Sequence, residues 1–481
     1  MNIAEASIQK RTVTLVMTAL LLIGGLLSFN NLSRLEDPEF TIKEALVITR
    51  YDGATPVEVE QEVTEVIETE IQKLEQLKEV SSISYAGLSI ITVEIQDKYD
   101  KHTLPAVWEQ LRRKINDVEA RLPPGVSKPV VRDDFGDVFG ILLALTGDGF
   151  TAKELQDHAD DLKRELLLVD GVAKISLWGE QQEAIFVEIS RARLAQLGIS
   201  QDQVYSLLSR QNLVSPAGKV RSGRDYIRIE PTGGINAVSD IENLLLRGPS
   251  TGSNLKPIYL KDVATVSRSY IEPAENIMLY NGQPAVSLGI STASGGNVVT
   301  MGTELEKRMA ELQADTPIGL ESHVIYMQPK MVTTAIDNFI VSLGQAIAIV
   351  IVVLLAFMGL RSGLLIGAIL LITVVATFIL MKLNGVALER ISLGALVIAL
   401  GMLVDNAIVV TEGMLIRIQQ GEDRIQAAKA VVNQTMWPLF GATVIAILAF
   451  AGIGLSQDAT GEFTRSLYQV ILYSLGLSWV I

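Results

Sequence analysis

The sequence predicts a polytopic α-helical membrane bundle joined to a large α+β domain outside the membrane. Hydrophobic residues make up 49% of the 481-residue chain and charged residues 20%, which is too apolar for one soluble enzyme and too charged for a protein buried wholly in lipid. Apolar segments stand at both ends of the chain, with about 300 residues of soluble character between them. Within that soluble part, strand-like and helix-like apolar spacings alternate.

The composition also excludes several classes of protein. The formal net charge is -14, so the chain lacks the basic surface with which nucleic-acid binders neutralise phosphates. The absence of cysteine excludes disulfides, zinc–thiolate sites and cysteine nucleophiles. The three histidines, His102, His158 and His323, lie far apart in the sequence. We therefore predict no nucleic-acid partner, no metal site and no enzyme, since no nucleophile triad or nucleotide fingerprint is present either.

The first apolar segment, residues 12–29, follows Lys10 and Arg11. A basic start before an apolar core also fits a secretory signal peptide. However, residues 29–33 lack the small-x-small pattern of a cleavage site, and about eighteen apolar residues are enough to cross a bilayer. We therefore predict an uncleaved membrane helix that keeps residues 1–11 in the cytoplasm.

The soluble part begins with a helix that has strong start signals. Thr55 can cap this helix, Pro56 suits its first position and Glu58 completes a capping box. The surrounding pattern predicts a strand over 45–49, this helix over 56–77, a strand over 90–95 and a second helix over 104–118.

The same plan starts again after residue 140. Thr151 and Glu154 form a second capping box, and the pattern V-x-x-I-S-x-x-G follows each first helix, over residues 80–87 and 172–179. Matching caps, helices and motifs in the same order indicate an internal duplication. We therefore predict two ferredoxin-like βαββαβ modules, of which the second carries a turn-rich insertion. Side by side, two such modules would form a cleft.

Further apolar segments in the last third of the chain predict five more membrane helices. With the N-terminus in the cytoplasm, most Lys and Arg of the short loops lie inside, and the long loop lies outside, in the periplasm of a Gram-negative cell. Because the last segment stops at Ile481 without a polar flank, we expect a fragment cut within its sixth helix. The predicted parts are the cytoplasmic N-terminus 1–11, helix 1 at 12–29, module 1 at 30–135, module 2 at 136–189 and 269–335, the insertion at 190–268, and helices 2–6 within 336–481 (336–358, 363–381, 391–416, 438–455 and from 467).

The residue best suited to chemistry is Asp405, near the middle of the span 391–416. It stands about seven residues, or roughly 10 Å, from the nearer interface. A carboxylate at that depth is costly against lipid, so we expect it to face other helices. A carboxyl held between desolvation and a nearby cation can take up and release protons, as a proton relay requires. The alternative is a protonated carboxyl that only holds helices together. If Asp405 is a proton relay, we expect no cofactor, because the proton-motive force is then the energy source.

Three neighbours of Asp405 are weaker candidates. Asn406 cannot ionise, and it is either a polar partner of the relay or a residue that only holds neighbouring helices together through hydrogen bonds. Glu412, two turns on, either lines a proton exit or is an interfacial acid. Gly401, one turn before Asp405, either lets a neighbouring helix approach closely or reflects ordinary small-residue packing. No Lys or Arg lies deep in any predicted span, so a cation for Asp405 would have to come from outside this chain.

Two motifs resemble one known family. Residues 401–410 match the G-x-x-V-D-[DN]-A-I-V-V signature of the fourth helix in the resistance-nodulation-division (RND) superfamily, and residues 51–60 resemble the opening of its first porter module. The order of one span, a long loop and five spans also matches. The chain thus resembles the N-terminal half of an inner-membrane multidrug-efflux permease. It departs from many drug pumps in having Asp405-Asn406 in place of two adjacent Asp, so only Asp405 is carried over as a titrating residue.

The resemblance implies a secondary active transporter, a proton antiporter that exports amphiphilic small molecules such as drugs, dyes and detergents. It implies porter modules, a docking subdomain at 190–268, a homotrimer in the bacterial inner (cytoplasmic) membrane, a periplasmic adaptor (membrane fusion protein) and an outer-membrane channel. The substrate-binding residues are not predicted. Export of soft metal ions or lipids is the alternative, for which the only hint is a set of methionines: Met301, Met309, Met327 and Met331. A membrane sensor or assembly scaffold is a third interpretation.

Overall fold

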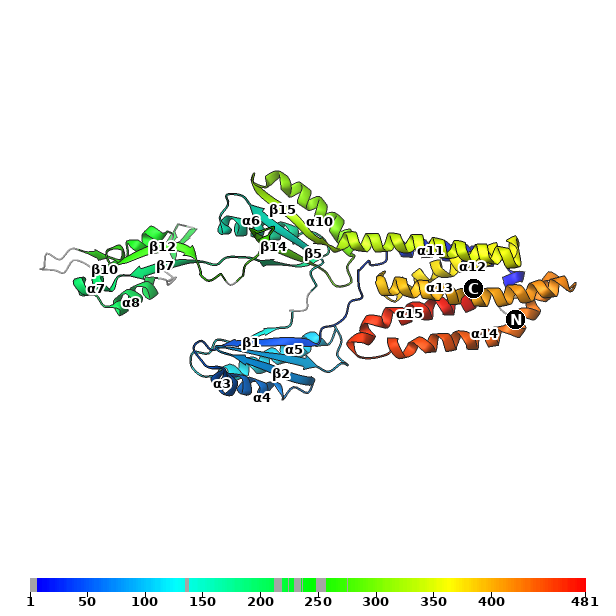
Figure 1. The fold of residues 1–481 in the computed structure, drawn as a ribbon, viewed down its shortest axis with the longest axis horizontal. Helices are drawn as coiled ribbons and strands as arrows, with labels where there is room; N and C mark the ends of the chain where they lie inside the picture. The colour runs from blue at the N-terminus through cyan, green and yellow to red at the C-terminus, as the bar shows by residue number, and fades with distance from the viewer. Residues whose placement is uncertain are drawn as a thin grey trace.

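The computed structural model describes residues 7–134, 138–211, 219–223, 225–228, 235, 237–247, 257–274 and 276–481. Figure 1 shows a helical bundle at one end of an elongated molecule, two α+β modules next to it, and a smaller inserted part at the far end. Both termini lie at the bundle. The predicted combination of long apolar helices with a sheet-containing domain is therefore confirmed.

Module 1 is an antiparallel four-stranded sheet whose strands pair in the order β2-β3-β1-β4. Alternate residues of β1 and β3 are buried, and they pack against Ile67 and Leu111 of the helices. One buried face and one open face explain the alternation in the sequence. The elements are β1 (Glu44–Arg50), α3 (Pro56–Val59), the π-helix η1 (Glu60–Thr64), α4 (Glu65–Ile71), β2 (Leu77–Tyr85), β3 (Leu88–Ile95), α5 (Leu104–Glu119) and β4 (Val130–Arg132).

Module 2 repeats this arrangement, because its strands pair in the order β6-β14-β5-β15. When the short strand β13 is left out and the other four strands of each module are numbered along the chain, both modules have the order second, third, first, fourth. The elements are β5 (Ile141–Gly147), α6 (Ala152–Leu166), β6 (Val172–Trp178), the short strand β13 (Leu279–Tyr280), β14 (Gln283–Thr292), α10 (Val298–Leu312), the 3-10 turn η3 (Gln313–Asp315) and β15 (Leu320–Met327).

Local signals of the duplication are also present in both modules. The Thr55 N–H donates to Glu58 Oε2 at 2.8 Å, and the Thr151 N–H donates to Glu154 Oε2 at 2.8 Å, so both predicted capping boxes form. The repeated motif ends in glycines with positive φ, +75° at Gly87 and +89° at Gly179. Only glycine adopts this conformation without strain, which explains why each copy of the motif ends in glycine.

The insertion is attached through two paired strands, β7 (Glu183–Ile189) and β12 (Ala264–Tyr270). Val187 and Val266 on these strands belong to the hydrophobic cluster of the insertion. Judged by strand pairing, the insertion starts at β7, whereas the sequence pattern placed its start after residue 189. The alternation of apolar and polar residues predicts a strand but does not show which other strand it pairs with. The predicted boundary at residues 135–136 and several turns of the insertion lie outside the described residues. The other described elements are α7 (Arg191–Leu197), α8 (Gln201–Gln211), β8 (Lys219–Ser222), β9 (Asp225–Arg228), α9 (Val238–Glu242), β10 (Leu245–Arg247), β11 (Ile258–Tyr259) and η2 (Leu260–Asp262).

Five helices in the described part of the chain are long and apolar enough to cross a membrane. They are α2 (Arg11–Asn30), α11 (Gln328–Met358), α12 (Leu360–Leu383), α13 (Arg390–Gln419) and α14 (Arg424–Gly454). The sixth predicted span lies in α15 (Ala459–Val480), which packs against α12, α13 and α14 but carries Glu462 and Arg465 near its start. Helices α11 and α14 begin well before residues 336 and 438, and Pro438 lies inside α14. Neighbouring helices make an internal proline tolerable in such bundles.

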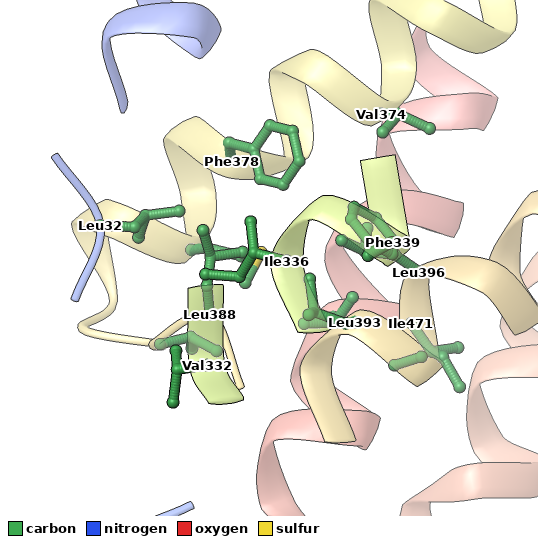
Figure 2. Packing of buried hydrophobic residues seen from close by; sticks show 14 of the residues in the cluster. Leu32, Val332, Ile336, Phe339, Val374, Phe378, Leu388, Leu393, Leu396 and Ile471 are labelled. Carbon is green, nitrogen blue, oxygen red and sulfur yellow. The ribbon is translucent and has the colours of Figure 1, made fainter. Parts of the chain in front are cut away.

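A hydrophobic cluster lies where the bundle meets module 2. Figure 2 shows Leu32, which follows α2, close to Val332 of α11, Phe378 of α12 and Leu388 from the loop before α13. The same cluster contains Val298, the first residue of α10 in module 2. One apolar core therefore joins module 2 to the outer end of the bundle.

Candidate functional site

Helix α13 carries the predicted relay residue at its centre. The Glu389 carboxylate caps this helix by accepting hydrogen bonds from the N–H groups of Ile391, at 2.7 Å, and Ser392, at 3.1 Å. Asp405 lies halfway along the 30 residues from Arg390 to Gln419. Thirty residues of α-helix extend about 45 Å, which exceeds the thickness of the hydrocarbon core. Asp405 is therefore far from both ends of the span.

The Asp405 side chain is exposed on the surface of the described chain. Val397, Gly401, Val409 and Glu412 are exposed as well, at the three- and four-residue spacing that puts them on the same face of α13. The described helices thus leave this face uncovered. That Asp405 faces other helices stays a prediction for the complete protein, because a carboxylate in a bilayer is not stable against lipid.

Asn406 points into the bundle instead. Its side-chain amide donates to Ser478 Oγ of α15 at 3.2 Å and to Thr443 Oγ1 of α14 at 3.5 Å. The Ser478 hydroxyl in turn donates to the carbonyl oxygen of Leu403 at 3.2 Å. These bonds join three helices at the level of Asp405. The geometry fits the packing role that the sequence left open for Asn406.

A cavity of about 330 Å³ lies beside Asn406, between α12, α13, α14 and α15. Its lining includes the polar side chains of Thr411, Thr435 and Ser478. A cavity of this size with several polar partners can hold water inside the bundle. Water could therefore approach α13 on the side opposite to the uncovered face.

Gly401 and Glu412 lie on the uncovered face. A Cβ added to Gly401 would meet no atom within 4 Å, so no described helix uses the space that this glycine leaves. The close approach expected there occurs at Gly25 of α2, where an added Cβ would lie 2.2 Å from the carbonyl oxygen of Val375 in α12. Glu412 is exposed and lines a shallow cavity together with Arg417.

The linker that joins α2 to β1, residues 31–43, carries contacts that sequence reasoning missed; we call this segment the strap. The Glu36 carboxylate accepts hydrogen bonds from the Tyr326 hydroxyl, at 2.8 Å, and the Gln328 amide, at 3.1 Å, and it forms an ion pair with Arg390. The acidic run from 36 to 39 directly after a span was a visible signal. Its partners lie about 290 and 354 residues away, so the sequence did not identify them.

A cavity of about 560 Å³ lies between the strap and the two modules. Its lining includes Glu39 of the strap, Asp133 of module 1 and Lys174 of module 2. The cavity occupies the place where the sequence predicts a cleft between the modules. Its walls carry both acidic and basic side chains.

An aromatic pair lies on the sheet of module 2, opposite its helices. Phe139 and Trp178 meet edge to face with ring centroids 4.9 Å apart, and Trp178 is 41% exposed. A Cβ added to Gly289 of β14 would lie 2.4 Å from the Trp178 ring. The missing side chain at Gly289 therefore lets the indole lie directly against the strand, where it presents an apolar surface to solvent.

A model of the AcrB/AcrD/AcrF family matches residues 3–481. The chain belongs to this family. It is 25% identical to multidrug resistance protein MdtC of Yersinia enterocolitica over 480 residues, which are 98% of this chain and 46% of the relative. MdtC of Yersinia pseudotuberculosis and of Yersinia pestis are each 26% identical with the same coverage. The chain therefore spans about half the length of the curated relatives it matches, and the resemblance to an RND permease is confirmed.

The four methionines that the sequence offered as a hint of a soft-metal path lie mostly in packing positions. Met301 and Met327 are buried in the hydrophobic core of module 2, and Met309 packs against that core. Met331 is exposed on α11. Three of the four therefore serve packing rather than lining a path for soft metal ions.

Proposed function

We propose that this chain is the relay-bearing part of a proton-driven exporter of amphiphilic small molecules such as drugs, dyes and detergents. The observation that carries the proposal is Asp405, an ionisable side chain at the centre of a membrane helix on a face that no described helix covers. Acidic groups at that depth mark proton or ion pathways. Membership of the AcrB/AcrD/AcrF family supports export, and relatives called multidrug resistance proteins support this class of cargo.

In this mechanism Asp405 alternates between the ionised and the protonated state. Helices from polypeptide outside these residues cover its face and supply the cation that the predicted spans of this chain lack. Gly401 leaves space for such a helix to approach closely, and Glu412 provides an acidic exit two turns away. Loss of the charge weakens the contact with the cation. Because Asn406 holds α13 to α14 and α15, these helices then shift together.

The substrate path is proposed to follow the modules. An amphiphile has an apolar part and a polar or charged part, and the modules offer surfaces for both. Phe139 and Trp178 present an aromatic face, and the cavity between the modules is lined by Glu39, Asp133 and Lys174. Aromatic side chains bind varied apolar groups through large rigid contact areas. Broad cargo selection is consistent with such a surface.

The proposed assembly is a homotrimer in the bacterial inner membrane with the modules in the periplasm. A periplasmic adaptor and an outer-membrane channel complete the path. The placement of Lys and Arg in the short loops supports this orientation. The insertion lies at the end of the molecule farthest from the bundle, which is where a docking subdomain would meet the channel (Figure 1).

The proposal is tested with the natural gene product that contains this chain, expressed in cells that lack other drug pumps. Asp405→Ala should lower the initial rate of ethidium efflux at least tenfold at an equal amount of protein in the membrane. The matched control is Asp157→Asn, which changes an exposed acid of α6 in module 2 and should leave efflux unchanged. Wild-type efflux by Asp405→Ala would refute the mechanism.

A further inference from the structure

The strap is bonded to the start of α13 through its main chain. The Leu35 N–H donates to the Leu388 carbonyl at 3.0 Å, and the Leu388 N–H donates to the Ser33 carbonyl at 2.8 Å. The Arg390 N–H donates to the Glu36 carbonyl at 3.1 Å. These bonds pair the strap with the loop before α13. Leu388 is fully buried in the cluster of Figure 2, so the residue that pairs with the strap is itself held in place by the hydrophobic core.

The side chain of Glu36 extends this attachment to module 2. One carboxylate binds Arg390, the first residue of α13, together with Tyr326 of β15 and Gln328, the first residue of α11. The Glu36 side chain is only 11% exposed. The Arg390 side chain is 54% exposed, so water screens that ion pair, whereas the hydrogen bonds from Tyr326 and Gln328 are partly buried and fix the position of the carboxylate. The start of the relay helix is therefore tied to the sheet of module 2 through the partly buried carboxylate of Glu36.

Glu39, three residues further along the strap, contacts both modules. Its carboxylate lies 3.0 Å from Lys101 Nζ of module 1, and it accepts hydrogen bonds from the Ser294 hydroxyl at 3.0 Å and the Gly295 N–H at 2.6 Å in module 2. The strap thus bridges the two modules at the point where the cavity separates them.

Lys43, at the end of the strap, ties module 1 to the bundle. Its Nζ lies 3.1 Å from Glu462 Oε1 of α15, and the two side chains are 6% and 14% exposed. The Thr41 N–H donates to the other oxygen of Glu462 at 3.0 Å. Lys43 directly precedes β1, so α15 is held to the first strand of module 1 through a buried ion pair.

We propose that the strap is the coupling element that transmits movement of α13 and α15 to both modules, with Glu36 as its central positioning residue. This rests on the proposed function, in which α13 moves when Asp405 changes its charge. Helix α11 continues directly from β15, whereas α13 and α15 each follow another helix of the bundle, α12 and α14. Their starts reach the modules through Glu36 and Lys43. Cavities of about 560 and 500 Å³, both lined by Glu39, leave the strap room to shift.

The test compares two readouts in the natural full-length gene product. The first is ethidium efflux per amount of membrane protein. The second is the distance between spin labels on Lys307→Cys of α10 and Lys382→Cys of α12. Residues 1–481 contain no cysteine, and any cysteine elsewhere in the gene product is first replaced by serine. Asp405→Asn, which mimics the protonated acid, should shift the label distance when the strap is intact. If Glu36 has only a structural role, Asp405→Asn should cause the same shift when Glu36 is replaced by glutamine.

Glu36→Gln should lower efflux at least fivefold and abolish the distance shift caused by Asp405→Asn. The exchanged pair Glu36→Arg with Arg390→Glu should regain at least half of the wild-type efflux, whereas each single reversal should not. Tyr326→Phe removes the hydroxyl that binds Glu36 and should lower efflux about twofold to threefold. This milder variant tests the coupling role of the strap if Glu36→Gln fails to fold. The control Asp157→Asn breaks an ion pair within α6 and should change neither readout.

The proposal is overturned if Glu36→Gln and Tyr326→Phe both export at the wild-type rate, or if the label distance still responds to Asp405→Asn in Glu36→Gln. Failure of the proposed function gives a different result, because Asp405→Asn would then keep efflux whatever the strap variants do.

Discussion

Adjacent residues on α13 have opposite environments. Asp405 is exposed on an uncovered face, whereas Asn406 is bonded to α14 and α15. A rotation of about 100° per residue accounts for this difference. Asn406 therefore packs within the bundle, whereas the side chain of Asp405 is left on the uncovered face.

The packing role of Asn406 predicts a stability loss on truncation. Asn406→Ala removes the hydrogen bonds to Ser478 and Thr443. Interhelical hydrogen bonds in membranes contribute about 0.5–1.5 kcal/mol, so the melting temperature in detergent should fall. Thr18→Ala is the control, because the Thr18 hydroxyl bonds within its own helix, to Thr14. A melting temperature of Asn406→Ala equal to that of Thr18→Ala would contradict the assignment.

Glu39 predicts a pH-dependent contribution to stability. Burial raises the pKa of its carboxyl, but hydrogen bonds from Gly295, Lys101 and Ser294 outweigh this and hold the pKa below its ordinary value. The stabilisation is therefore present above the unfolded-state pKa of about 4.3 and is lost as the pH falls through the lower folded-state value. Glu39→Gln should therefore destabilise the protein more at pH 7 than near pH 3.

Thermal unfolding at the two pH values measures this difference. Glu60→Gln, at an exposed glutamate of η1, is the control and should change stability by less than about 0.5 kcal/mol at either pH. An equal loss for Glu39→Gln at both pH values would show that its ionised carboxylate is not the stabilising species.

At the scale of elements, α2 and α12 pack through a glycine. A Cβ at Gly25 would lie 2.2 Å from the backbone oxygen of Val375, whereas one at Gly24 would lie 3.4 Å from the tip of Ile379. The first contact requires a backbone shift and the second is ordinary. Gly25→Ala should therefore cost on the order of 1–3 kcal/mol in the stability of the folded protein, and Gly24→Ala much less.

Thermal unfolding of the two variants in detergent is a matched comparison, because both change glycine to alanine in the same turn of the same helix. Equal melting temperatures would mean that α2 does not depend on close contact with α12.

Local elements were predictable where a signal lies within a few residues. The capping boxes at Thr55 and Thr151 form because cap and partner are three residues apart. The pairing of β7 with β12 was not predictable, since it joins segments about 80 residues apart across the insertion. The early start of α14 was missed for another reason: Pro438 normally ends a helix in water, but the bundle accommodates it.

The same distinction holds for the candidate site. Asp405 could be predicted as a candidate from sequence, because an acid at the centre of an apolar segment is costly in lipid and the segment itself shows this. The contacts of Glu36 and Lys43 were not found, because a surface acid after a span looks ordinary until its distant partner is known. That Asp405 is uncovered by the described helices follows only from three-dimensional packing.

At the scale of the whole molecule, bundle, modules and insertion follow one another along the long axis (Figure 1). The strap contacts the bundle and both modules within thirteen residues, 31–43. If the charge of Asp405 changes and α13 moves, the contacts of the strap connect that movement to the modules. This arrangement is what a transporter needs if a proton crosses in the bundle while its cargo moves through the modules.

The most direct test of the central claim, that Asp405 carries the coupled proton, is substrate-dependent proton flux in proteoliposomes that contain the natural gene product. We expect ethidium to trigger proton flux with the wild-type protein, and no flux above background with Asp405→Asn at the same protein content. Substrate-driven proton flux at the wild-type rate in Asp405→Asn would contradict the account.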